Sequence, residues 1–187
     1  MLIRILAFLL ETLFFVLIAA ALLRAWMNWT RVNMSAQPGN FVMAVTDWIV
    51  KPLRRTLSAR LVKSKIDWAS LLAAGVLALM YALLWSLLYG ALMGVTHWMP
   101  GLGSLLTLLI FAAKMLVKFA LQTAMFIVFV FVVLSWVQPG SPFYSTLGRL
   151  TDPLLTPLRR VVPTIGGIDM SALVLILILQ VGLMVVS

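Results

Sequence analysis

The acidic residues are the first groups in this sequence whose types and spacing could do chemistry. The 187 residues contain only five, which are Glu11, Asp47, Asp67, Asp152 and Asp169. No two of them share one short segment, so the chain offers no carboxylate pair for general acid–base catalysis. It has no cysteine and a single histidine, so neither a thiolate nucleophile nor a clustered metal site is expected. We therefore expect a protein that is not an enzyme and that needs no cofactor or metal.

Glu11 and Lys118 are opposite charges that each stand inside a long apolar stretch. A charge in the bilayer interior costs several kcal/mol, so such residues are usually paired or functional. Lys114 and Gln122 lie one helical turn before and after Lys118, on the same face. We expect Glu11 to pair with Lys118 and to dock two parts of the protein together. A place on an ion or proton path is one alternative, and snorkelling of each charge without a partner is another.

Arginine pairs occur twice in nearly the same setting. Residues 46–55 and 151–160 are identical at six of ten positions, and both end in Pro-Leu-Arg-Arg. The pairs Arg54-Arg55 and Arg159-Arg160 are expected to contact anionic lipid headgroups, at about 1 kcal/mol for each charge. A specific anionic lipid or an acidic partner protein is the alternative for these four residues.

The four aspartates are expected to begin helices. Asp47 and Asp152 open the two arginine motifs, and Pro153 suits the first position of a helix, so we interpret both carboxylates as N-caps. Pairing with the arginines of the same loop and coordination of an ion are the alternatives. Asp67 and Asp169 stand before the apolar stretches that follow the two loops, where they too are expected to cap helices.

The composition shows which solvent surrounds the elements that carry these residues. The chain is 64% hydrophobic and 10% charged, with a mean hydropathy of +1.13. A soluble domain of this size could not cover so much apolar surface in water. The net charge of +9 comes from basic residues that lie between apolar stretches, which favours anionic lipid headgroups over nucleic acid as their partner.

Four stretches are long enough to span a bilayer core of about 30 Å as helices. They are residues 5–27, 69–93, a segment that ends near 137, and 170–186. The region 103–137 would make a helix of about 50 Å, so we prefer a span over 115–137 that follows an interfacial or re-entrant piece over 105–113. A single long helix is the alternative. The first stretch is not expected to be a removed signal peptide, because Glu11 interrupts its apolar core.

The sequence therefore predicts an all-α, polytopic membrane protein made of two repeats. The first repeat is 1–93 with a basic loop at 28–68, and the second is 94–187 with a basic loop at 138–169. By the positive-inside rule both loops face the cytoplasm of a bacterial cell, across its inner membrane, and both termini lie on the opposite side. Within each loop, apolar residues recur every three or four positions, which predicts an interfacial amphipathic helix. Pro52 and Pro157 are expected to break or kink these helices into two short pieces.

The motifs of the second repeat resemble those of the YggT family of bacterial membrane proteins, which is related to the YlmG proteins. After Arg159-Arg160 come Val162-Pro163, then Gly166-Gly167-Ile168-Asp169 and Ser171, and the segment before them contains Leu134-Ser135-Trp136-Val137. The resemblance covers nearly the whole chain as a tandem pair. The first repeat departs from it, because Ser64-Lys65 replaces the two glycines. Those glycines permit a tight turn before the last helix, and a phosphate-binding loop is the alternative.

The resemblance implies membership of a family with no settled biochemical activity. Its members are linked to osmotic-stress tolerance, to cell division and nucleoid or thylakoid organisation, and to cytochrome b6 maturation in plastids. From the residues we expect a membrane scaffold or assembly factor whose basic loops contact anionic lipid, a membrane-protein partner or a second copy of the chain. An ion or osmolyte channel or transporter is the alternative, with Ser86, Thr96 and Gln180 as its polar groups.

Overall fold

The computed structural model describes residues 2–34, 37–57, 66–93, 102–162 and 169–186, and these residues are helical with short turns and no strand. The expected all-α class is confirmed. The helices in chain order are α1 (Leu2–Trp29), α2 (Gly39–Thr56), α4 (Trp68–Met93), α5 (Leu102–Val137), α6 (Pro142–Arg159) and α7 (Met170–Val186). Of the residues singled out above, Ser64-Lys65, Thr96, Pro163 and Gly166-Gly167-Ile168 lie outside the described part of the chain, as does the single histidine, His97.

The helices α1, α4 and α5 are each long and apolar enough to cross a membrane. The fourth expected span, α7, is apolar but has only 17 residues. At 1.5 Å per residue it is about 26 Å long, which is at the lower limit for a bilayer core of about 30 Å. The chain is therefore a helical membrane protein, and among its described helices three are long and apolar enough to cross a membrane while α7 is apolar but shorter.

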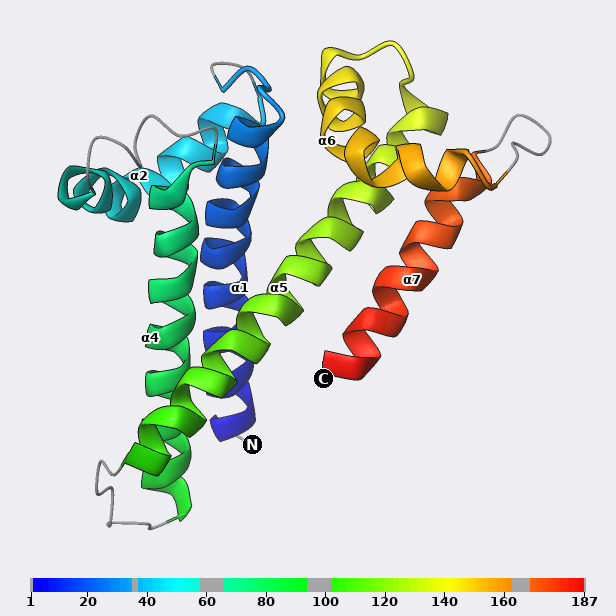
Figure 1. The fold of residues 1–187 in the computed structure, drawn as a ribbon. Coiled ribbons are helices and arrows are strands. Elements are labelled where there is room, and N and C mark those ends of the chain that lie inside the picture. The colour runs from blue at the N-terminus through cyan, green and yellow to red at the C-terminus, as the bar shows by residue number, and fades with distance from the viewer. Residues whose placement is uncertain (1, 35–36, 58–65, 94–101, 163–168, 187) are drawn as a thin grey trace.

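The helix α5 corrects the expected break in the third span. It runs without interruption over 36 residues, so residues 105–113 are part of one long helix and not a separate interfacial or re-entrant piece. No glycine or proline occurs between Ser104 and Val137, and nothing in the local sequence therefore ends the helix. A helix of this length is about 54 Å long. It runs obliquely past α1 and α4 (Figure 1), and tilt of this kind shortens the distance that a long helix crosses.

The amphipathic helices α2 and α6 lie at the same end of the molecule, which we name the loop end (Figure 1). Each has 18 residues and buries one apolar side. Helical structure continues through Pro52 in α2 and through Pro153 and Pro157 in α6, so neither helix is broken at these prolines. Both helices change direction along their length (Figure 1), which agrees with the expected kink.

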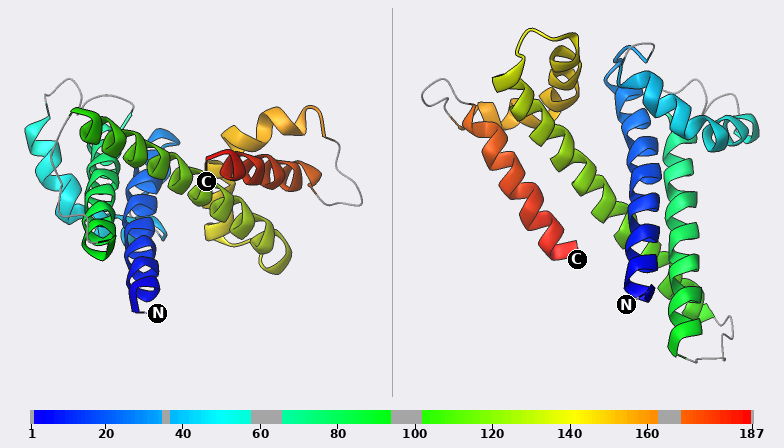
Figure 2. Two further views of the ribbon diagram at one scale, coloured as in Figure 1. Left: turned by 90° about the horizontal axis from the view of Figure 1, so that it is seen from below. Right: turned by 180° about the vertical axis from the view of Figure 1, so that it is seen from behind.

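The hydrophobic side chains pack into two clusters that share α5. The first joins α1, α2 and α4 to the N-terminal half of α5, around Ile18, Leu77, Tyr81 and Phe119. Buried alanines, among them Ala21, Ala73, Ala74, Ala78 and Ala82, line this cluster, and small residues let helix backbones approach closely in a membrane. The second joins the C-terminal half of α5 to α6 and α7, and it also takes in Met27 of α1 and Val42 of α2. Figure 2 shows α7 on the other side of α5 from α1 and α4.

Candidate functional site

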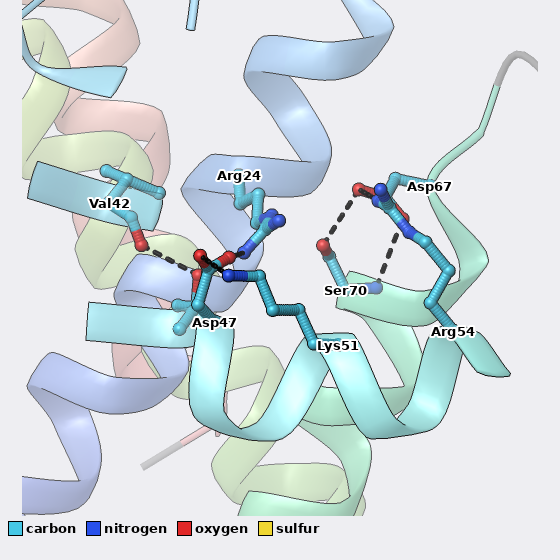
Figure 3. Close-up of polar contacts among 8 residues, drawn as sticks. Arg24, Val42, Asp47, Lys51, Arg54, Asp67 and Ser70 are labelled. Atoms are coloured by element: carbon cyan, nitrogen blue, oxygen red, sulfur yellow. Dashed lines mark hydrogen bonds and ion pairs between the residues drawn. The ribbon is translucent and has the colours of Figure 1, made fainter. Parts of the chain in front are cut away.

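A buried arginine fastens α2 to α1 at the loop end. Arg24 is only 6% exposed, and its Nη1 donates to Thr46 Oγ1 and to Asp47 Oδ1, both at 2.8 Å. The ammonium of Lys51 lies 2.7 Å from Asp47 Oδ2. The hydrogen bond from Lys51 lowers the pKa of Asp47, and Arg24 adds to this effect, while burial opposes it. Figure 3 shows Asp47 between the two cations.

The expectation that Asp47 and Asp152 cap helices is wrong. The helices that contain them begin at Gly39 and Pro142, so both aspartates lie in helix interiors. The cap of α6 is Ser141, whose Oγ accepts a hydrogen bond from the backbone N–H of Tyr144. The predicted start of α6 was wrong because Pro153 was taken as its first residue, whereas Pro142 is the first residue of the helix.

A second arginine holds the end of α2 against the start of α4. Arg54 Nη2 lies 3.0 Å from Asp67 Oδ2, and Ser70 Oγ donates to the same oxygen at 2.9 Å. Asp67 stands directly before α4, and the backbone N–H of Ser70 donates to its Oδ1 at 3.4 Å. The carboxylate thus combines an N-cap with an ion pair, and it is itself only 7% exposed.

The second repeat contains the equivalent arrangement. Arg159 donates from Nε to Asp169 Oδ2 at 2.8 Å, and its Nη1 reaches Asp152 Oδ1 at 3.2 Å. Asp169 Oδ1 accepts hydrogen bonds from the backbone N–H and the hydroxyl of Ser171. Burial acts to raise the pKa of Asp169, but the hydrogen bonds from Ser171 and Arg159 outweigh it and the pKa is lowered. In both repeats, therefore, the first arginine of the pair joins the amphipathic helix to the aspartate before the next helix.

The second arginine of each pair has a different environment. All four arginines are exposed at the loop end, but Arg55 and Arg160 take part in no ion pair among the described residues. The four arginines expected to contact lipid or a partner thus divide into two that bind an aspartate and two that have no carboxylate partner in the described part of the chain.

The structure brings Glu11 and Lys118 together within the membrane-spanning part. Lys118 Nζ on α5 lies 2.8 Å from Glu11 Oε1 on α1, so the ion pair joins the first repeat to the second. It borders a cavity of about 570 Å³ whose other lining residues include Thr12 and Gln122 and are mostly aromatic or aliphatic.

Arg24 is the site residue that the sequence analysis missed. The signal was present, since Arg24 is a charge inside the first apolar stretch, as Glu11 is. The same argument applied to Arg24 predicts a partner for it.

Among the described residues, no three of the metal-ligating types (His, Cys, Asp, Glu) lie close enough together to hold an ion.

Comparison with known proteins places these features in a family. A model of the CCB3/YggT family matches residues 3–88 and again residues 102–187. The "Uncharacterized protein YggT" of Escherichia coli strain K12 is 37% identical over 181 residues, which cover 94% of this chain and 86% of the relative. An "Uncharacterized protein in proC 3'region" of Vibrio alginolyticus is 31% identical and covers 93% of this chain and 89% of its own length. The "Uncharacterized protein ycf19" of Guillardia theta is 38% identical over 71 residues, or 36% of this chain and 77% of the relative.

No solved structure matches the chain significantly. The family assignment therefore comes from sequence similarity. The match covers both three-helix units, α1–α2–α4 and α5–α6–α7. The chain belongs to the CCB3/YggT family.

Proposed function

We propose that this protein is a non-enzymatic scaffold or assembly factor of the bacterial inner membrane. Its loop end faces the cytoplasm and holds anionic lipid headgroups, or an acidic partner protein, through Arg55 and Arg160. The observation that carries this proposal is the division of the arginine pairs: the first arginine of each is held by an aspartate, while the second is exposed and has no ion pair among the described residues.

Exposed aromatic side chains on α2 support a position of this helix at the membrane interface. Phe41 and Trp48 of α2 are each 58% exposed, although large aromatic residues are rarely left in water. Aromatic rings and basic groups on one amphipathic helix suit the boundary between acyl chains and headgroups. Arg55 at the end of α2 and Arg160 just after α6 would then lie at headgroup level, each attracted to an anionic leaflet by about 1 kcal/mol.

The experiment compares lipid retention by the wild-type protein and by the double variant Arg55→Gln/Arg160→Gln. Each is purified in a mild non-ionic detergent and exchanged into phosphatidylglycerol or phosphatidylcholine. Bound lipid and co-purifying protein are then identified by native mass spectrometry and crosslinking. Loss of two charges should reduce the preference for phosphatidylglycerol by about 2 kcal/mol, or roughly 30-fold.

The matched control is Arg4→Gln/Lys114→Gln, which removes two exposed basic charges outside the loop end. It should keep the preference for anionic lipid. Equal lipid and partner retention by the wild type and the Arg55/Arg160 variant would contradict the proposal.

A channel or transporter role is the second candidate, and the cavity beside Glu11 favours it. The cavity has polar side chains in Glu11, Thr12 and Gln122, within the membrane-spanning part of α1 and α5. Ion flux into liposomes tests this role. Flux that disappears in Glu11→Gln and persists in Arg55→Gln/Arg160→Gln would favour a conducting function over the scaffold.

A further inference from the structure

A small cavity lies among α1, α2 and α4 at the loop end. Its volume is about 200 Å³, and the residues that line it are Arg24, Asn28, Met34, Met43, Arg54, Leu57, Asp67, Trp68 and Ala69. It is separate from the larger cavity beside Glu11. Two guanidinium groups, Arg24 and Arg54, therefore reach the same small space.

Arg24 has hydrogen-bond donors left for this cavity. Within the described residues, both of its hydrogen bonds come from Nη1, which leaves Nη2 and Nε to face other groups. Arg24 is more than nine-tenths buried, and it is one of the residues that line the cavity. In Figure 3, Arg24 lies between Asp47 on one side and the Asp67–Ser70 pair on the other. The cavity is thus a space beside the guanidinium in which an acceptor can meet these donors.

The charges around the cavity show what kind of acceptor fits. Of the residues that line the cavity, Arg24 and Arg54 contribute two positive charges and Asp67 contributes one negative charge, so the lining carries a net charge of +1. A group with one negative charge neutralises it. The planar fork of arginine matches the oxygens of a phosphate better than it matches a spherical ion.

The remaining walls suit an ester of phosphate. Met34, Met43 and Leu57 contribute apolar side chains to the lining of the cavity. Methionine side chains adapt to irregular apolar groups. The cavity also lies at the loop end, where the spans α1 and α4 meet α2 (Figure 1).

We propose that this cavity binds a phosphate group of one negative charge, held by Arg24 and Arg54. The site belongs to the first repeat alone. Arg24 stands two residues before Trp26, and the residue two before the matching Trp136 is Leu134, so the second repeat lacks the buried guanidinium. The site does not depend on the exposed arginines Arg55 and Arg160, and its failure is therefore separable from that of the proposed scaffold.

The experiment uses the full chain, purified in a phosphate-free non-ionic detergent. Two probes are compared: inorganic phosphate, read as a rise in the thermal unfolding midpoint, and phosphatidylglycerol, read as a single lipid retained in native mass spectrometry. Binding of either probe supports the site when Met43→Phe weakens it, because that variant leaves Arg55 and Arg160 in place. Phosphatidylglycerol retained in preference to phosphatidylcholine identifies a lipid headgroup, and a response to inorganic phosphate alone identifies a free anion.

Two variants close the site in different ways. Arg24→Gln removes the guanidinium, and Met43→Phe fills the cavity from α2 while the ion pair between Arg24 and Asp47 stays intact. Both should weaken binding at least tenfold. Arg149→Gln removes one exposed positive charge from α6 and should leave binding unchanged.

Met43→Phe decides the result if Arg24→Gln does not fold. Binding of phosphate and of one phosphatidylglycerol at wild-type strength in Met43→Phe would overturn the proposal. So would a wild-type protein that responds to neither probe, because the cavity would then hold only water.

Discussion

Both repeats hold their amphipathic helix by one equivalent contact, and the first repeat has a further contact that the second lacks. In each, the first arginine of the Pro-Leu-Arg-Arg motif binds the aspartate before the next helix. Only the first repeat adds Arg24, whose guanidinium lies buried between α1 and α2. The repeated motif thus encodes the connection to the following helix, while one unrepeated residue decides how tightly the preceding helix is held.

The equivalent threonines show the same difference. Thr46 and Thr151 are both buried, and each donates to a carbonyl of its own helix, Thr46 to Val42 and Thr151 to Leu147. Only Thr46 also accepts a hydrogen bond from the preceding span, through Arg24. Two identical residues at equivalent positions therefore contribute differently, because the partner comes from another element.

The largest effect that can test this contrast is loss of Asp47. In Asp47→Ala the buried Arg24 keeps its charge and loses its carboxylate, which should lower the free energy of unfolding by about 3 kcal/mol. Asp152 is exposed, so Asp152→Ala should cost less than about 1 kcal/mol. Both values follow from denaturation by sodium dodecyl sulfate in mixed micelles. Equal losses in the two variants would mean that Arg24 does not distinguish the repeats.

The contact between the repeats should be the next strongest. Glu11→Gln leaves Lys118 within the membrane-spanning part without its carboxylate, which should lower the free energy of unfolding by about 2 kcal/mol, because Lys118 can still extend toward the interface. The exchange Glu11→Lys with Lys118→Glu should recover more than half of the loss, as measured by the same denaturation. An exchange variant no more stable than either single variant would show that the pair does not dock the repeats.

Acidification should have the smallest effect and should act on both repeats. The pKa values of Asp47 and Asp169 are lowered from an ordinary value of 3.8. Their contributions to stability are therefore fully present above pH 3.8 and are lost as the pH falls through the lowered values. The thermal unfolding midpoint in detergent should stay level from pH 7 to about pH 5 and fall below pH 3.8.

The variants Asp47→Asn and Asp169→Asn apportion this acid loss between the repeats. Each should start with a lower midpoint at pH 7 and show a shallower fall in acid than the wild type. An unchanged acid profile in both variants would assign the loss to other carboxylates.

The sequence predicted a contact of the site either where the partner is nearby in the chain or where both charges stand inside apolar spans. The positions of Asp67 and Asp169 before their helices could be predicted, because capping involves the next few residues. The pairing of Glu11 with Lys118 was expected because a charge in lipid needs a partner and the apolar spans offer few. The contact between Asp47 and Arg24 belongs to neither case, since Asp47 lies in an amphipathic loop helix and meets Arg24 only because α2 folds back on α1.

The sequence by itself determined that this chain is a helical membrane protein with a repeated unit, because hydropathy and motif spacing are properties of the chain alone. Only the tertiary structure decided that α5 is one oblique helix shared by both hydrophobic clusters. It also decided which arginine of each pair is held by an aspartate. The reason is that the two arginines of a pair have the same local propensity, and their roles differ only through the distance of each to a carboxylate outside its own helix.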